Sequence, residues 1–182
     1  SDTTEVILDN VRIPLENRLG GPDGSEGGGM AGIYETLEAT RVGVAASALG
    51  IARAAYEAAL QYSRERTAFG KIIGPMPVIQ PSLADMTPAR DAARLMVYRA
   101  AWLQSQGREC GVEATMAKMY AANVAVRGCD RAIQIHGGMG LTNECEVARY
   151  WKLARLWQIG PITNEQCRNL IGQLRCELPR SY

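Results

Sequence analysis

Two short segments of the chain combine residue types that could bind a phosphate-bearing or planar ligand. The first, residues 64–71, reads Arg-Glu-Arg-Thr-Ala-Phe-Gly-Lys and places several cations beside the single phenylalanine, Phe69. A guanidinium suits a diphosphate, and an aromatic face suits a ring system. The same residues also fit an ordinary helix C-terminus, where arginine stabilises the helix dipole.

The second segment, residues 134–140, reads Gln-Ile-His-Gly-Gly-Met-Gly. Paired glycines expose backbone amides and allow an anion or a flat ring to come close, although many such pairs only form a turn between helices. For His136, the only histidine, we expect a packing or capping role rather than a catalytic one. A further segment, Glu38-Ala39-Thr40-Arg41, lies inside a helical pattern, and its charges could simply face water.

The composition excludes several classes of protein. The chain has 20 Lys and Arg against 19 Asp and Glu, so its net charge of +1 gives no argument for a nucleic-acid or membrane-surface partner. Lysine is rare among the basic residues, and an arginine bias fits a phosphate-bearing ligand. A single histidine excludes a multi-histidine metal site and leaves little room for a Ser-His-Asp triad.

Cysteine usage and the absence of targeting signals predict a cytoplasmic protein. The five cysteines are scattered without a C-x-x-C pair, which is typical of reduced thiols. The first residues lack the basic region and apolar core of a signal peptide. No uncharged apolar run approaches the ~20 residues that span a bilayer, so we expect no membrane span.

The hydrophobic pattern predicts an all-α protein, an antiparallel (up-down) four-helix bundle with a short N-terminal extended or β remnant. Apolar residues recur at spacings of three and four, which predicts helices over residues 30–66, 82–106, 112–135, 144–157 and 164–178. The second helix should be interrupted or restarted near Pro88, and residues 70–81 should be non-helical or kinked. Strand-forming residues fill 5–19, and a glycine-rich loop follows at 20–29.

Taken in order, these motifs resemble the C-terminal half of the acyl-CoA dehydrogenase family of flavoproteins. The resemblance covers essentially the whole chain and rests on residues 10–17 (Asn-Val-Arg-Ile-Pro-Leu-Glu-Asn), 66–71, 83–86 (Leu-Ala-Asp-Met), 117–121 (Ala-Lys-Met-Tyr-Ala) and 134–140. It implies that residues 1–24 are the exit segment and loop from a β-domain and that 25–182 form the C-terminal helical-bundle domain. Family members also carry an N-terminal helical domain and a β-domain, so we expect the chain to be part of a longer protein.

The resemblance implies a cofactor, a substrate and partners. Family members bind FAD, partly across a subunit interface, and oxidise the Cα–Cβ bond of an acyl-CoA thioester in fatty-acid metabolism. The implied cofactor-binding positions are Arg66, Phe69, Gln134, Gly137, Gly138 and Thr163, and the implied substrate-binding positions are Glu38 and Arg41. Electron-transfer flavoprotein would accept the electrons. We expect a homo-oligomer, either a dimer or a tetramer, and a hetero-oligomer is the alternative.

The chain departs from the family at the catalytic base. The usual base is a glutamate in a Tyr-Glu-Gly-Thr segment, and the aligned residues 160–163 read Gly-Pro-Ile-Thr, which puts Pro161 at its position. The alternative base position, on the long helix, holds Thr40. Neither residue can act as a carboxylate base. Glu38 is two residues from Thr40 and points about 200° away on a helix, so we interpret it as a channel-lining or solvated charge.

Three functions therefore stay open. The first is an acyl-CoA dehydrogenase-like flavoprotein oxidoreductase. The second is a non-catalytic subunit or domain that completes a shared flavin site in a hetero-oligomer. The third is a flavoprotein that acts on a CoA thioester without the usual base, for example by eliminating a β-leaving group.

Overall fold

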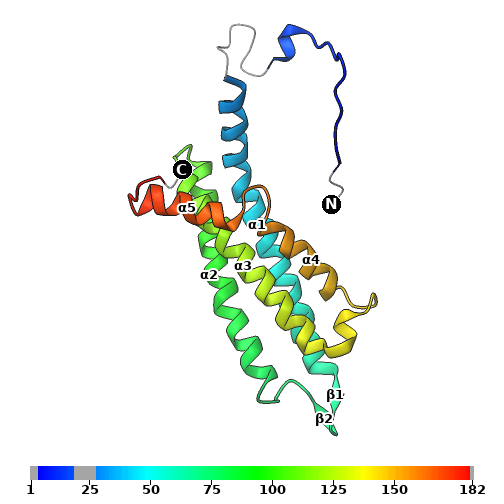
Figure 1. Ribbon diagram of the computed structural model, residues 1–182. Coiled ribbons are helices and arrows are strands. Elements are labelled where there is room, and N and C mark those ends of the chain that lie inside the picture. The colour runs from blue at the N-terminus through cyan, green and yellow to red at the C-terminus, as the bar shows by residue number, and fades with distance from the viewer. Residues whose placement is uncertain (1–3, 19–27, 181–182) are drawn as a thin grey trace. The chain divides into compact units, whose positions relative to one another are not determined.

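The structure, a computed structural model, describes residues 4–18 and 28–180. Apart from one small hairpin, its regular elements are all helices (Figure 1). The elements are η1 (Leu15–Asn17), α1 (Gly28–Glu65), β1 (Thr67–Ala68), β2 (Lys71–Ile72), α2 (Ile79–Ser105), α3 (Gly111–His136), η2 (Gly137–Leu141), α4 (Val147–Trp157) and α5 (Asn164–Arg175). The all-α prediction is confirmed. None of the helices in these two ranges has the length and apolar character needed to cross a bilayer.

The chain divides into two compact units, Ser1–Leu37 and Glu38–Tyr182. In the larger unit α3 is central and contacts α2, α4, α5 and η2. Side chains from α1 contact both neighbours, because Thr87 on α2 donates to the Tyr56 hydroxyl (3.4 Å) and Arg41 donates to Thr115 on α3 (3.1 Å). Within this unit α1, α2, α3 and α4 alternate in direction, as an up-down four-helix bundle requires, and α5 lies across them (Figure 1).

Alanine is the commonest residue in the buried core of this unit, beside a smaller number of Val, Leu, Ile and Met side chains. The fully buried alanines are Ala45, Ala48, Ala55 and Ala59 on α1, Ala93 and Ala100 on α2, Ala114, Ala117, Ala121, Ala122, Ala125 and Ala132 on α3, and Ala154 on α4. On α1 and α3 most recur at spacings of three and four, so these two helices each present a stripe of small side chains. Because alanine ends at Cβ, the backbones can approach closely and still reach the packing density of a protein interior. The same residues also favour helix intrinsically.

The predicted interruption of α2 at Pro88 is wrong, because the helix continues unbroken from Ile79 to Ser105. Proline removes the hydrogen bond to the carbonyl four residues earlier, and that residue, Ala84, is exposed, where water can satisfy its carbonyl. Pro81 is the third residue of the helix, and there the N–H would lack an intrahelical partner in any case.

The only strands in the described residues are β1 and β2, two residues each, and they form a hairpin that the sequence analysis did not predict. Thr67 pairs with Ile72 and Ala68 with Lys71. The turn residues, Phe69 and Gly70, both have positive φ (53° and 78°), as a type I′ hairpin turn requires. Residues 4–18 form no strand, and η1 is their single regular element; strand-forming side chains alone are insufficient without a neighbouring strand to pair with.

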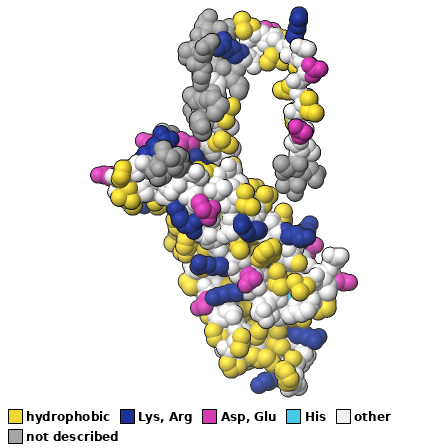
Figure 2. Space-filling model, in the orientation of Figure 1, with side chains coloured by type: hydrophobic (Ala, Val, Ile, Leu, Met, Phe, Trp, Pro, Cys, Tyr) yellow, Lys and Arg dark blue, Asp and Glu magenta, His cyan; other side chains and the backbone are white. Residues whose placement is uncertain are grey.

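Basic side chains are distributed over the surface of the larger unit. Figure 2 shows Lys and Arg side chains lying among hydrophobic and acidic ones on the face in view, not gathered into one patch. Several are paired with carboxylates on their own helix, such as Arg53 with Glu57 (2.8 Å) and Arg168 with Glu165 (3.3 Å). This distribution agrees with the near-neutral net charge.

The turn after α3 requires glycine at position 140. A Cβ there would lie 2.8 Å from the Ile133 carbonyl oxygen and 3.0 Å from the His136 Cβ. We expect Gly140→Ala to lower the free energy of unfolding by about 1–3 kcal/mol through overpacking. Gly50→Ala is the control, because nothing lies within 4 Å of its added Cβ, and it should stabilise helix α1 by about 0.5–1 kcal/mol. Chemical denaturation measures both, and equal effects would contradict this account of η2.

Candidate functional site

The first group of candidate residues lies where α1 ends. Arg66 follows the helix, its N–H donates to the Tyr62 carbonyl (2.9 Å), and its own carbonyl accepts from the Ile73 N–H (2.9 Å). These bonds attach the β1–β2 hairpin to the end of α1. Phe69 lies in the hairpin turn and is 96% exposed. An aromatic ring presented in this way offers a whole face to a ligand or partner.

A stacked ring pair joins the end of α1 to the end of α3. The rings of Tyr62 and His136 lie 4.3 Å apart between centroids, with 25° between their planes. The His136 Nδ1–H donates to the Ala132 carbonyl (2.7 Å), because a carbonyl oxygen can only accept. His136 is buried, and its predicted packing role is confirmed.

This ring pair links the hairpin to the glycine turn. Gly137 has a φ of +61°, a conformation that glycine adopts without strain, and open space surrounds the Cβ positions of Gly137 and Gly138. Gln134, one turn earlier on α3, is exposed. The structure therefore brings Arg66 and Phe69 to the same end of the bundle as Gln134 and the two glycines. We call these five residues the nucleotide group, after their predicted ligand.

The second group surrounds the loop between α4 and α5, residues 158–163. Lys118 on α3 is fully buried, and its Nζ donates to the Ile162 carbonyl (2.5 Å) and to Asn164 Oδ1 (3.0 Å). Burial is the largest cause of the lowered pKa of Lys118. The ammonium thereby holds the loop that contains Pro161, whose ring is exposed.

An asparagine on α3 fixes the two ends of the same loop. Asn123 Oδ1 accepts hydrogen bonds from Gln158 Nε2 (2.9 Å) and from Asn164 Nδ2 (3.0 Å). Thr163 caps α5 through a hydrogen bond from the Gln166 N–H to its Oγ1 (3.2 Å). Asn123 therefore holds both ends of the loop, and Lys118 holds the Ile162 carbonyl inside it. The Thr163 cap adds a further contact at the start of α5.

The predicted channel residues of α1 lie beside this buried lysine. Arg41 is 8% exposed, donates to Thr115 Oγ1 (3.1 Å) and pairs with Glu38 at 3.5 Å, and its Nε has no hydrogen-bond partner. The positive charge of Arg41 contributes to lowering the pKa of Lys118. Glu38 and Thr40 are exposed. Of the two base positions expected from the sequence, Thr40 precedes the buried Arg41 in the chain, and Pro161 precedes the residue whose carbonyl Lys118 binds.

The two groups are well separated along the bundle. Gln134 lies sixteen positions after Lys118 on α3, which corresponds to about 24 Å along the helix axis. The structure thus brings each group together internally but does not combine the two. Lys118 and Asn123 were missed as individual functional candidates in the sequence, although a lysine on the same helical stripe as Ala114, Ala117 and Ala121 signals a buried charge.

Comparison with known proteins identifies the family. Residues 27–174 match the family described as acyl-CoA dehydrogenase, C-terminal domain. The chain belongs to the acyl-CoA dehydrogenase family. Acyl-CoA dehydrogenases are FAD-dependent oxidoreductases, and the resemblance found in the sequence is confirmed.

Several acyl-CoA dehydrogenases are similar to the chain over much of its length. A probable acyl-CoA dehydrogenase of Bacillus subtilis is 43% identical over 173 residues, covering 95% of this chain and 44% of the relative. The solved butyryl-CoA dehydrogenase of Megasphaera elsdenii is 38% identical with a TM-score of 0.85, covering 93% and 43%. A glutaryl-coenzyme A dehydrogenase complexed with glutaryl-CoA is 33% identical with a TM-score of 0.88, covering 96% and 43%. The chain therefore spans less than half the length of the relatives it matches.

The Lys118 bonds predict a specific loss of stability. Lys118→Met keeps the buried stem but leaves the Ile162 carbonyl and Asn164 Oδ1 without their donor, and unsatisfied buried acceptors cost about 1–3 kcal/mol. We expect that decrease in the free energy of unfolding, measured by denaturant titration. Lys152→Met, at an exposed position on α4, should stay within about 0.5 kcal/mol of the parent. Equal losses in the two variants would contradict the role of Lys118.

Proposed function

We propose that this chain is the C-terminal domain of an FAD-binding acyl-CoA dehydrogenase-type enzyme, which oxidises the Cα–Cβ bond of an acyl-CoA thioester or carries out a variant of that chemistry. The supporting observation is the nucleotide group, which the Tyr62–His136 stack assembles at one end of the bundle. Its residue types match those that the family uses to bind a flavin nucleotide. We place the reaction in the cytoplasm, because the five cysteines are scattered and no disulfide framework is visible.

The residues of the nucleotide group fit part of an FAD site. Arg66 is exposed and has no ion pair among the residues that the structure describes, so its guanidinium can bind the diphosphate bidentately. Phe69 can cover a ring, and the Gly137–Gly138 backbone leaves room for close approach. Thr163, the remaining predicted cofactor position, lies in the α4–α5 loop rather than in the nucleotide group, and its hydroxyl caps α5. Bound FAD would supply the hydride acceptor, while these residues hold and orient it.

The separation of the two groups supports an oligomer with shared sites. One chain carries its nucleotide group about 24 Å along α3 from the loop near Arg41, so each flavin would use the nucleotide group of one subunit and the channel residues of another. Closed symmetric assemblies meet this need by repeating the same contact. This arrangement supports a homo-oligomer, either a dimer or a tetramer, with a hetero-oligomer as the alternative.

An electron-transfer flavoprotein is the acceptor that the comparisons favour. A relative that is 38% identical over 157 residues is a subunit of the caffeyl-CoA reductase–Etf complex of Acetobacterium woodii. A solved chain described with the electron-transferring flavoprotein of Acidaminococcus fermentans is 41% identical with a TM-score of 0.80. We carry this partner over to the present chain as part of the proposal.

The α4–α5 loop keeps variants of the reaction open beside the standard oxidation. Pro161 has no acid–base group, and Glu38 is paired with Arg41. Removal of an α-proton needs a positioned base, typically worth about 10²–10⁴-fold in rate. Two alternatives therefore accompany the leading proposal: a subunit that completes the flavin site of a catalytic partner chain, and a flavoprotein that eliminates a β-leaving group from a CoA thioester.

Flavin content tests the nucleotide group. The intact protein should be yellow when purified, and Arg66→Ala should weaken FAD retention at least about tenfold because a charge-assisted contact to the diphosphate is lost. Arg64→Ala removes an exposed cation from the last turn of α1 and should leave FAD content unchanged. Absorbance after gel filtration gives the FAD to protein ratio. A colourless preparation that takes up no flavin would rule out the proposed function.

Anaerobic mixing with a panel of saturated acyl-CoAs tests the base position. We expect slow flavin bleaching in the parent protein and a rate about 10²–10⁴-fold higher in Pro161→Glu, which supplies a carboxylate. Pro161→Gln is the matched uncharged control and should stay slow. Rapid bleaching of the parent would show that a base is present elsewhere. Co-purification with a homologous, glutamate-bearing chain would favour the partner-subunit alternative.

A further inference from the structure

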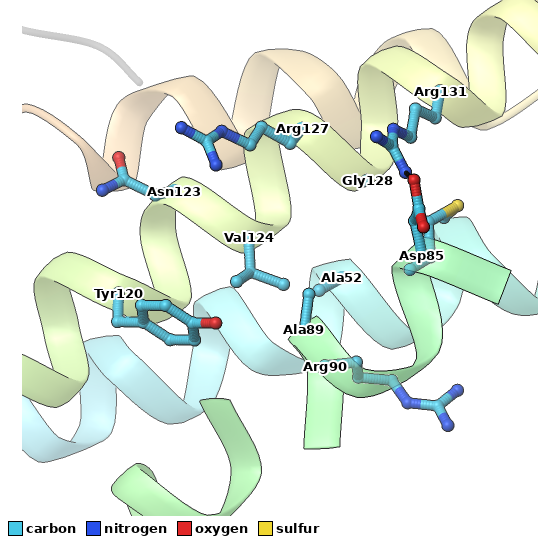
Figure 3. Close-up of a pocket in the computed structure, with 11 residues that line it drawn as sticks. Ala52, Asp85, Ala89, Arg90, Tyr120, Asn123, Val124, Arg127, Gly128 and Arg131 are labelled. Carbon is cyan, nitrogen blue, oxygen red and sulfur yellow. Dashed lines mark hydrogen bonds and ion pairs between the residues drawn. The ribbon is translucent and has the colours of Figure 1, made fainter. Parts of the chain in front are cut away.

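A cavity of about 360 Å³ lies between α2 and α3, and one residue of α1 also lines it (Figure 3). Its apolar surface is formed by Ala52 of α1, Met86 and Ala89 of α2, and Val124 and Gly128 of α3. Small-molecule sites are typically clefts of roughly this size, mostly apolar with a few polar groups. None of the residues of the nucleotide group, and neither Glu38 nor Arg41, lines this cavity.

Gly128 of α3 forms part of the cavity wall. A Cβ at Gly128 would meet only the Met86 methyl group, at 3.7 Å, so the space beyond it has room for a side chain. Glycine in the interior of a helix weakens that helix. Gly128, which disfavours helix, therefore lies in the wall of the cavity.

The polar lining is cationic and only partly neutralised. Three arginines and a single carboxylate line the cavity. Arg131 Nη1 is paired with Asp85 Oδ2 at 3.1 Å. Arg90 is paired through Nη2 with Asp91, which lies outside the lining, at 3.5 Å, and its Cζ lies 4.5 Å from the centroid of the Tyr56 ring. Its guanidinium points away from the other labelled side chains in Figure 3. For Arg127 the described part of the chain provides no ion pair or hydrogen bond.

Asn123 offers a second donor beside Arg127. Its Oδ1 already accepts two hydrogen bonds from the α4–α5 region, from Gln158 and Asn164. These bonds fix the orientation of the amide, and its Nδ2 has no acceptor among the described residues. Arg127 extends along α3 toward Asn123 (Figure 3). An unpaired guanidinium and an unpaired amide N–H thus lie at one end of an apolar cavity.

We propose that this cavity binds a small amphipathic carboxylate. The guanidinium of Arg127 and the Nδ2 of Asn123 hold the carboxylate, because arginine binds a carboxylate bidentately and an amide N–H adds a further donor. The apolar part of the ligand covers Ala89, Val124 and the space above Gly128. The combination selects for a ligand with one anionic end and a short apolar body.

Octanoate is the probe for this site. Titration of the intact protein followed by calorimetry should show saturable binding of one octanoate per chain. Octylammonium, which has the same chain and the opposite charge, should not bind measurably. Inorganic phosphate should bind at least about tenfold more weakly than octanoate, because it cannot use the apolar surface. Absence of saturable octanoate binding, or equal binding of octylammonium, would overturn the proposal.

Two variants test the anionic and apolar halves of the site separately. Arg127→Glu should weaken octanoate binding at least about tenfold, and so should Gly128→Leu, which fills the cavity and changes no charge. Arg149→Glu makes the same charge change on α4, where the arginine is exposed and paired with Glu146, and should bind octanoate as the parent does. Unchanged binding in both test variants would overturn the site.

A folded-state check keeps these outcomes independent of the flavin site. Each variant is first compared with the parent by circular dichroism, and Arg127→Gln replaces Arg127→Glu if the latter does not fold. Flavin content should stay at the parental value in Arg127→Glu, since Arg127 belongs to neither candidate group. Loss of octanoate binding with retained flavin therefore supports this inference, whatever the outcome for the proposed function.

Discussion

The buried ammonium of Lys118 determines how the α4–α5 loop is held. A charge without solvent must be hydrogen-bonded to be tolerated, and here a loop carbonyl and the Asn164 side chain provide the acceptors. The same contacts that solvate the lysine therefore fix the loop and the start of α5. Asn164 Nδ2 in turn donates to Asn123 Oδ1. Because Asn123 lines the cavity between α2 and α3, the hydrogen-bond network extends to the wall of that cavity. One buried charge thus links the helix packing to the loop that carries Pro161, the predicted base position.

The larger unit has candidate residues at two sites, and each is incomplete within this chain. At one end, Phe69 and the glycine turn expose an aromatic face and backbone amides. Nearer the other end, Arg41 and Lys118 place two cations in the interior, with Glu38 the carboxylate paired to Arg41. An unpaired hydrogen-bonding group such as the buried Arg41 Nε costs free energy until an acceptor arrives. Both sites fit a domain whose ligands also contact other parts of an assembled protein.

Much of the helical fold could be predicted because spacing carries that information. Apolar residues at intervals of three and four predicted every long helix, and the family motifs predicted the nucleotide group. The continuity of α2 through Pro88 was not predictable from local rules, since it depends on the exposure of Ala84. The hairpin turn at Phe69 was also missed, because a non-glycine residue at positive φ has no clear sequence signal. Asn123 and Lys118 act through contacts more than thirty positions away, which periodicity cannot reveal.

The alanine-filled interior has a consequence for rigidity. A buried alanine loses no rotamer freedom on folding, and it has no alternative rotamer to adopt afterwards. The buried alanines of α1 and α3 therefore have no alternative side-chain conformation that would let one helix slide along the other. The helix α3 acts as a spacer of fixed length between the two candidate sites. Any motion that brings ligands together must come from the exposed hairpin, from the loops, or from the way that whole subunits meet.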